Sequence, residues 1–458
     1  MMRSLFSGVT GLKTHQTKMD VIGNNIANVN TVGFKNSSVT FSELMYQTTQ
    51  NASGANAATG RAGVNAKQIG LGVTNGAINT NITTSGASQT TGNPFDIQIT
   101  GDSFFIVSDG ANNYFTRAGA FYVDGVGNLA MTSNGFTVMG WKEDPMAPGY
   151  IKKDTVQALT ITSPENMQSE PEATTQAYMT GIMDKNTKSL STTGQIVNLS
   201  FYDNLGYSYV AKFAFKDQDA NNGIYSMKLD DIVYEDNTGA TAHVTPLPAI
   251  DGAGGTTIYV KYDVATGAYL GWDTTPPAAA PAHGPTEAFT MDFDQTSLPA
   301  FKDVAVDMKN TTMYDNNGTS TIAAKAGNPD GQYAGRKVGT MSGVAVQTDG
   351  KIYASYDNGT TKLLGQIAVA SFPNPSGLEK IGENLYQTTM NSGLFDGIGI
   401  DVTSDGIGKM QTGVLEMSNV DLSAEFTEMI TTQRGFQANS RIITVSDSLL
   451  EELTNLKR

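Results

Sequence analysis

Apolar residues recur at helical spacing at the two ends of the chain. From Ser4 to about Asn28 and from Asn419 to Arg458, they fall seven apart, with further apolar residues beside each stripe. This period gives a helix one continuous apolar face. Because the C-terminal segment holds no Pro, it predicts a helix of about 35 residues and about 50 Å. The candidate helix-packing residues are Leu5, Val9, Leu12, Met19 and Ile26 at the first end, and Leu422, Phe426, Met429, Phe436, Ile443, Leu450 and Leu453 at the second.

Both stripes need a surface to pack on. Two core helices of one globular domain would satisfy them, but their positions at opposite ends of the chain favour a coiled-coil pair of terminal helices. Asn419 or Asp421 can cap the start of the second helix, and Glu425 and Glu428 lie near the positive end of its dipole. The sequence does not decide whether the pair is parallel or antiparallel.

The N-terminal helix is weak by composition. Gly8, Gly11 and Gly23 lie inside it, and each costs up to about 1 kcal/mol relative to Ala. We therefore expect this helix to become ordered only when a neighbour supplies packing.

Between the ends the pattern changes to that of strands and tight turns. Asp96–Ile99 alternates, and Phe104–Val107 is a continuous apolar run. Asp124-Gly125 and Asn134-Gly135 are typical of hairpin turns. Further strand patterns lie at Tyr114–Phe115, Phe121–Val123, Gln195–Tyr202, Tyr209–Phe215 and Thr257–Val260, and further turn pairs at Asp349-Gly350 and Asn358-Gly359.

These patterns predict a mainly β protein with long terminal α-helices, in the α+β class, with β domains nested inside a helical pair. Each inner domain would then be formed from discontinuous segments. The expected parts are residues 1–30 with 419–458 as a terminal helical coiled coil, 31–70 with 391–418 as an extended connector, 71–150 with 335–390 as an inner β domain, and 151–334 as an inserted outer β domain.

Composition narrows the classes of function. The net charge is −15, which argues against a nucleic-acid partner and against docking on anionic lipid. There are no cysteines, so disulfides and thiolate metal sites are excluded. No apolar run approaches the roughly 20 residues of a membrane span. The first residues lack the apolar core of a signal peptide, so we expect none to be cleaved.

Candidate chemistry is sparse. The three histidines, His15, His243 and His283, are far apart in the sequence and have no evident partners. Asp217–Gly223 begins like a Ca²⁺ loop, but its Gly comes one place late and Lys228 stands at the twelfth position. It predicts a polar hairpin turn instead. Because no phosphate loop or nucleophile elbow is present, we expect no catalytic, cofactor-binding or metal residues and no enzyme activity.

Long motifs at both ends resemble a known family. Ser4–Leu12, Met19–Lys35, Ser418–Leu422 and Gln433–Ser440 resemble the terminal signatures of the bacterial flagellar rod and hook proteins. Three inner segments look like the hook form of that family, and the length fits it, since rod proteins are much shorter. These segments are Phe34–Leu44, Gln68–Val73 and Leu364–Phe372.

The resemblance implies a structural role. Hook proteins polymerise into a curved, flexible tube outside the cell, which couples rod to filament and transmits torque like a universal joint. They leave the cell through the flagellar type III export apparatus. The implied partners are other copies of this chain, the distal rod protein, the hook cap and the hook–filament junction proteins. Alternatives are a distal rod or junction protein of the same family, or an extracellular β-rich adhesin.

Overall fold

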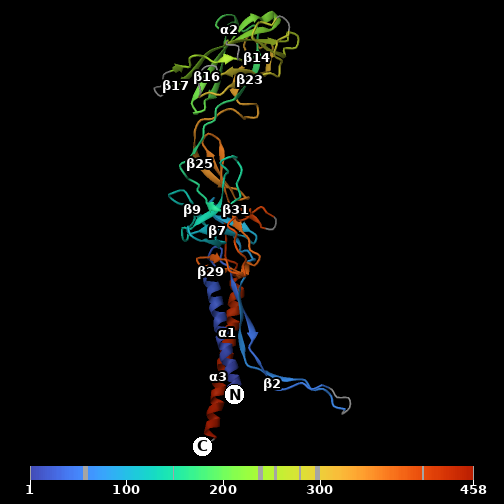
Figure 1. The fold of residues 1–458 in the computed structure, drawn as a ribbon, viewed down its shortest axis with the longest axis vertical. Helices are drawn as coiled ribbons and strands as arrows, with labels where there is room; N and C mark the ends of the chain where they lie inside the picture. Colours follow the sequence, from blue (N-terminus) through green and yellow to red (C-terminus); the bar gives the residue numbers. More distant parts are fainter. Residues whose placement is uncertain are drawn as a thin grey trace. The chain divides into compact units, whose positions relative to one another are not determined.

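The computed structural model describes residues 2–54, 60–147, 149–235, 241–251, 255–277, 280–293, 300–404 and 407–456. The chain forms two compact units (Figure 1). Unit 1 contains residues 1–166, 343–355 and 361–458, and unit 2 contains residues 167–342 and 356–360. Both units are therefore built from discontinuous segments, as the nested organisation predicted. The finer division into four parts stays a prediction.

Two long helices lie side by side in unit 1. They are α1 (Met2–Ala27) and α3 (Leu422–Asn455), and they run antiparallel (Figure 1). Of the two predicted caps, Asp421 is the one used: its Oδ1 accepts hydrogen bonds from the backbone N–H groups of Ser423 at 2.8 Å and Ala424 at 3.4 Å. The 34 residues of α3 match the predicted length. None of the helices in the described ranges combines the length and the apolar character that crossing a bilayer demands.

The β part of unit 1 interleaves early and late segments of the chain. Its longest path of paired strands runs β26-β27-β11-β7-β8-β30-β29, and β6 pairs with β31 and β5 with β32. A buried cluster that includes Phe104, Phe115, Trp141 and Phe372 fills its core. The strands are β1 (Ser37–Glu43), β2 (Tyr46–Gln50), β3 (Lys67–Gly70), β4 (Val73–Thr80), β5 (Ser88–Thr90), β6 (Ile97–Thr100), β7 (Phe104–Ser108), β8 (Asn113–Thr116), β9 (Phe121–Val123), β10 (Leu129–Met131), β11 (Thr137–Lys142), β12 (Gln157–Ala158), β26 (Lys351–Tyr356), β27 (Thr361–Ile367), β28 (Val369–Ala370), β29 (Glu379–Gly382), β30 (Leu385–Gln387), β31 (Lys409–Thr412) and β32 (Val414–Glu416).

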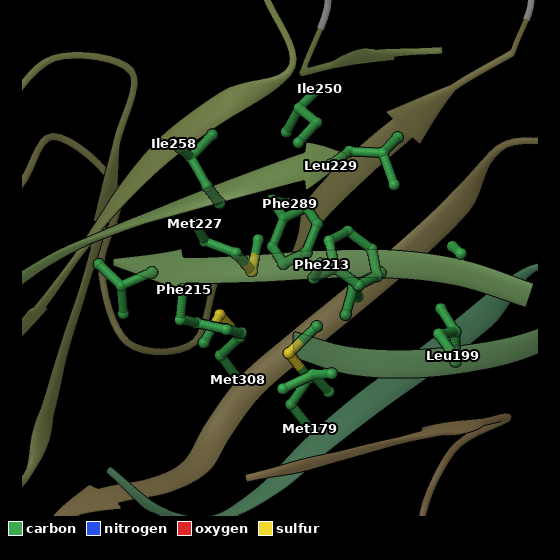
Figure 2. Close-up of a cluster of buried hydrophobic side chains, with 14 of the residues drawn as sticks. Met179, Leu199, Phe213, Phe215, Met227, Leu229, Ile250, Ile258, Phe289 and Met308 are labelled. Carbon is green, nitrogen blue, oxygen red and sulfur yellow. The ribbon is translucent and has the colours of Figure 1, made fainter. Parts of the chain in front are cut away.

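Unit 2 is a sandwich of two sheets. One has the order β19-β22-β23-β14-β24, with β14 and β23 parallel, and the other has the order β15-β16-β17-β20-β21, with β18 beside β17. Apolar side chains alternate inward along the strands, and Figure 2 shows those of both sheets meeting in one core, among them Met179, Phe213 and Met308. The elements are β13 (Gln168–Ser169), β14 (Gln176–Met183), α2 (Lys188–Ser191), β15 (Gln195–Tyr202), β16 (Ser208–Asp219), η1 (Ala220–Asn222), β17 (Ile224–Glu235), β18 (Thr241–His243), β19 (Ala249–Ile250), β20 (Thr257–Tyr262), β21 (Tyr269–Asp273), β22 (Phe289–Asp292), β23 (Val304–Met313) and β24 (Ala323–Ala326), and the chain returns to unit 1 within β25 (Gly339–Val346).

The predicted turns join neighbouring strands. Asp124-Gly125 lies between β9 and β10, and Asn134-Gly135 lies between β10 and β11. The segment compared with a Ca²⁺ loop is a hairpin turn between β16 and β17, in which the Asp219 carboxylate accepts a hydrogen bond from the backbone N–H of Asn222. Gly223 follows it at φ = 70°, a left-handed conformation that favours glycine. The turn prediction is confirmed.

Candidate assembly surface

Most of the residues that the terminal helices bury are small or polar. They are Gly8, Gly11, Thr14 and Asn25 of α1, together with the apolar Ile22, and Thr432 and Ser446 of α3. Side chains of this size leave little apolar area to bury, so the contact depends on close approach of the two backbones. The seam between the two helices therefore differs from a coiled coil in which large apolar residues face each other.

Glycines let the two helices approach closely at the seam. A Cβ added to Gly11 would lie 2.5 Å from Nδ2 of Asn439, and one added to Gly435 would lie 2.7 Å from Cε1 of His15. A Cβ at Gly8 would lie 3.2 Å from Cγ1 of Ile443. Gly8 and Gly11, which weaken α1 as an isolated helix, thus permit its close pairing with α3.

Polar side chains set the register of the pair. Asn25 Nδ2 donates to Glu425 Oε1 at 2.9 Å, and Lys18 Nζ lies 3.2 Å from Glu428 Oε2. Partial burial raises the pKa of the Glu425 carboxyl, and the hydrogen bond from Asn25 partly offsets that rise. Lys18 and Glu428 remain partly exposed, so solvent and salt screen their attraction.

The sequence-predicted packing residues lie outside the fully buried seam. Eight of them are half-buried and four are exposed. Among the half-buried ones, Ile443 faces Gly8 across the seam. The structure thus gathers the stripe on one helix pair without enclosing it. The half-buried residues are Leu5, Leu12, Met19, Ile26, Met429, Phe436, Ile443 and Leu450, and the exposed ones are Val9, Leu422, Phe426 and Leu453.

A second set of apolar side chains, which the heptad pattern missed, is exposed on the same helices. On α1, Met2 and Phe6 join Val9 at i, i+4, i+7 spacing, which places all three on one face. On α3, three apolar doublets carry the signal for Ile430, Ile442 and Leu449, because adjacent residues point to different sides of a helix. Val445 of α3 and Leu456, which follows the helix, are also exposed.

The end of α3 extends past the start of α1. Ser446 lies opposite Ser4, with 3.4 Å between their Oγ atoms, so the last turns of α3 lie beyond the first turn of α1 (Figure 1). Leu453 and Leu456 are on this extension, and they are 49% and 82% exposed. We name the exposed and half-buried apolar residues of α1 and α3 together the helical apolar surface.

A two-stranded hairpin lies beside the helices. Strands β1 and β4 pack along α1, where Asn75 Nδ2 donates to Thr17 Oγ1 at 3.2 Å. Strands β2 and β3 continue from them and pair with each other, and every residue of these two strands is exposed. An isolated two-stranded hairpin is at best marginally stable in water. This one carries exposed Tyr46 and Ile69.

His15 lies under the base of this hairpin. Its ring meets Phe41 edge-on at 5.5 Å between centroids, in a hollow of about 340 Å³ that α1 and the hairpin strands line. Burial, with a smaller contribution from Lys18, lowers the pKa of this imidazole. His15 is therefore partly buried, between α1 and the hairpin strands. In the described ranges, no group of three or more His, Cys, Asp or Glu side chains is placed to hold a metal ion.

Family profiles match three segments of the chain: one includes most of α1, one includes α3, and one covers strands that lie between the two helices in the sequence. The profile described as flagella basal body rod protein matches residues 5–35. The profile described as flagellar hook protein FlgE/F/G D1 domain matches residues 98–174, and that described as flagellar basal body rod FlgEFG protein C-terminal matches residues 411–456.

Curated relatives match over the whole chain. The flagellar hook protein FlgE of Treponema pallidum is 34% identical over 479 residues, with 100% of both chains covered. That of Borreliella burgdorferi is 35% identical over 476 residues, again with 100% of both chains covered. The chain belongs to the flagellar hook and rod protein family.

Within the flagellar hook and rod protein family, matches extend to the rod. The flagellar basal-body rod protein FlgG of Bacillus subtilis is 30% identical over 458 residues, with 100% of both chains covered. Among solved structures, the Helicobacter pylori flagellar hook protein FlgE2 has a TM-score of 0.39 and 13% identity, covering 72% of this chain and 100% of that one. The family is one of structural flagellar proteins, and its two terminal profiles include most of the helical apolar surface.

Proposed function

We propose that this chain is the structural subunit of a bacterial flagellar hook and polymerises through its terminal helices. The observation that carries the proposal is the helical apolar surface. Phe6, Phe426 and Ile430 are 62%, 50% and 59% exposed on helices whose mutual seam is small and polar. Membership in the family and the full-length similarity to proteins named hook protein support the hook as the assembly that this chain forms.

The energetic argument concerns surface that a single chain cannot bury. Complete burial of one Leu, Ile or Phe side chain contributes about 1.5–3 kcal/mol. Several such side chains on one helix pair would therefore drive pairs from neighbouring subunits together. A contact between different faces of identical subunits is heterologous, and it generates a helical polymer when the rotation between subunits does not close into a ring.

The β units would serve a different purpose in the tube. Gly and polar residues are abundant in the chain, which has 49 Gly. Contacts between such surfaces are weak and replaceable, so subunits can slide past one another as a curved tube turns. The helices would then hold the polymer together while the β units permit its bending and the transmission of torque.

Location and partners follow from the same proposal. The tube lies outside the cell, and the subunit reaches it through the flagellar type III export apparatus. Its partners are other copies of itself, the distal rod protein at one end, the hook–filament junction proteins at the other, and the hook cap during growth.

Electron microscopy of basal bodies from cells lacking this gene tests the proposal. We expect complete rods that carry neither hook nor filament. Hooks present without filaments would place the protein at the hook–filament junction, and normal flagella would contradict a flagellar role altogether.

A distal rod protein is the second candidate, because the Bacillus subtilis rod protein FlgG matches the chain over its full length. Truncated rods in the same deletion strain would favour that candidate over the hook. Re-expression of the wild-type gene is the control in either case.

A further inference from the structure

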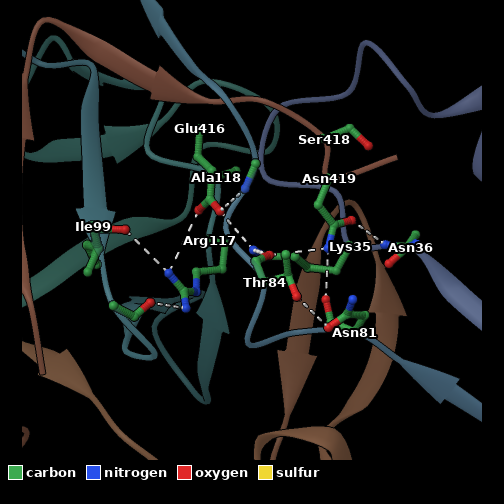
Figure 3. Close-up of polar contacts among 12 residues, drawn as sticks. Lys35, Asn36, Asn81, Thr84, Ile99, Arg117, Ala118, Glu416, Ser418 and Asn419 are labelled. Carbon is green, nitrogen blue, oxygen red and sulfur yellow. Dashed lines mark hydrogen bonds and ion pairs between the residues drawn. The ribbon is translucent and has the colours of Figure 1, made fainter. Parts of the chain in front are cut away.

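Three buried charged side chains meet where the chain leaves the two terminal helices. Lys35 follows α1, Glu416 is the last residue of β32 before α3, and Arg117 directly follows β8. All three side chains are at most 1% exposed. Figure 3 shows them converging in one cluster within unit 1. The cluster therefore joins the N-terminal connection, the β part and the C-terminal connection.

Glu416 makes the central contacts. Lys35 Nζ lies 2.8 Å from Glu416 Oε1 and also donates to the Thr84 carbonyl at 2.7 Å. The backbone N–H of Gly86 donates to the same carboxylate oxygen at 3.1 Å. One carboxylate therefore holds both the N-terminal connection and the segment that precedes β5.

Arg117 approaches the other oxygen of the carboxylate. Its Nη1 lies 3.8 Å from Glu416 Oε2, and its guanidinium donates to the carbonyls of Ile99 and Gly101. The guanidinium carbon also lies 5.2 Å from the centroid of the Phe104 ring. These contacts fix Arg117 to β6 and β7. Arg117 therefore links Glu416 to the β part of unit 1.

The cluster carries more positive than negative charge. Two buried cations face one buried carboxylate, and Asp102 adds only a more distant attraction from an exposed position. Burial lowers the pKa of Lys35 and of Arg117, and Glu416 opposes this in both. Burying charge is unfavourable unless the geometry satisfies it. Replacing a buried ion pair by well-packed apolar side chains is often neutral or stabilising, so stability alone does not account for this cluster.

Backbone contacts tie the same segments together. Gly33 N–H donates to the Glu416 carbonyl at 2.8 Å. Asn419 Oδ1 accepts from the backbone N–H of Asn36 at 2.8 Å, and Asn419 Nδ2 donates to the carbonyls of Asn81 and Thr84 (Figure 3). The two connections are thus fixed to each other and to the strands around them.

We infer that Glu416 is a positioning residue that locks both terminal-helix connections onto the β part of unit 1, forming a rigid joint between helices and sheet. In a hook polymer, this joint would make the helices and the β part of unit 1 move together. That consequence rests on the proposed function. The joint itself is a property of the single chain, so its test does not require a polymer.

Two variants of the cluster differ in the buried charge that they leave unpaired. Glu416→Gln keeps the shape of the side chain but leaves two buried cations without a carboxylate. Lys35→Met leaves one cation with one carboxylate. We expect the first to loosen the joint more than the second. In the double variant one uncompensated cation is removed, so we expect partial rescue, whereas a role in packing alone would make the two losses add.

Hydrogen–deuterium exchange on the full, unpolymerised chain measures the joint. In Glu416→Gln, we expect amide exchange at least tenfold faster in residues 31–36, 84–87 and 416–421, with β7 and unit 2 unchanged. The matched control is Asp401→Asn, which removes a 2.8 Å ion pair with Lys153, a side chain 50% exposed. This control should leave exchange in the three joint segments at the wild-type rate.

Three results would overturn the inference. The first is wild-type exchange in the joint segments of Glu416→Gln. The second is exchange that rises equally through β7, because the cluster would then be ordinary core. The third is a double variant looser than Glu416→Gln alone. If Glu416→Gln fails to fold, the same exchange measurement on Lys35→Met tests the inference. Wild-type exchange in the joint segments of that variant would overturn it. Polymerisation of the same variants, measured separately, reports on the proposed function.

Discussion

At the scale of single residues, steric space decides what each glycine of α1 does. Gly11 faces Asn439, and any Cβ there would collide with that side chain, whereas a Cβ at Gly23 would meet nothing within 4 Å. The sequence gives both residues the same helix-weakening effect. The structure shows that only the first is compensated by close packing of the helices. Identical residues on one helix thus have opposite consequences.

Substituting alanine at each position tests this difference. Gly23→Ala should stabilise α1 by about 0.5–1 kcal/mol, because alanine loses less backbone entropy on folding. Gly11→Ala should lose more than that gain, because Asn439 must move. Each substitution is the control for the other, and thermal melting of the assembled polymer followed by circular dichroism measures both. Equal shifts in the same direction would contradict the close-packed seam.

At the scale of elements, the sandwich of unit 2 buries tyrosines among its strands. Tyr225 of β17 and Tyr262 of β20 are fully buried, and Tyr262 donates its hydroxyl to Thr311 Oγ1 at 3.0 Å. Burial raises the pKa of Tyr225 to about 12 and also raises that of Tyr262. Alternating strand patterns predicted which side chains point inward, and the resulting core keeps these phenols neutral.

Alkaline unfolding should report this burial. The folded pKa of Tyr225 exceeds its ordinary value of 10.0, so the unfolded chain releases its proton first. The stability of unit 2 should therefore be complete below pH 10 and fall as pH rises from about 10 to about 12. Urea unfolding followed by Trp272 fluorescence measures it, and Tyr225→Phe should show a shallower decline. An unchanged slope in that variant would contradict the argument.

At the scale of the whole molecule, what the sequence could predict was local. The seven-residue stripes, the strands such as Gln195–Tyr202 and the turn at Asp124-Gly125 depend on neighbouring residues, and all three appear in the structure. The cluster of Lys35 with Glu416 joins residues that are 381 positions apart. Sequence shows no distances, so this cluster, the antiparallel direction of the helices and the glycine seam could not be predicted from it.

Assembly is also a property of this scale. Phe436→Asp or Leu450→Asp should abolish polymerisation while the β units remain folded, because a carboxylate on the helical apolar surface loses its hydration when subunits pack. Phe6→Asp should do the same with little effect on the single chain, since Phe6 is 62% exposed. Thr444→Asp, at an exposed polar position of α3, is the matched control. Sedimentation measures polymerisation, and circular dichroism measures the folding of the β units. Normal polymers from Phe436→Asp or Leu450→Asp would refute the role of the helices.

The pairing of α1 with α3 makes the fold a check on the integrity of the chain. The first helix pairs with the last helix of the chain, and the Lys35 ammonium forms its ion pair with the carboxylate of Glu416. A chain cut between residues 361 and 416 keeps the whole sequence of unit 2 and can still fold its sandwich. It nevertheless leaves α1 unpaired and Lys35 without its counter-ion. We therefore expect such a truncated product to be unable to join a growing polymer through its helices.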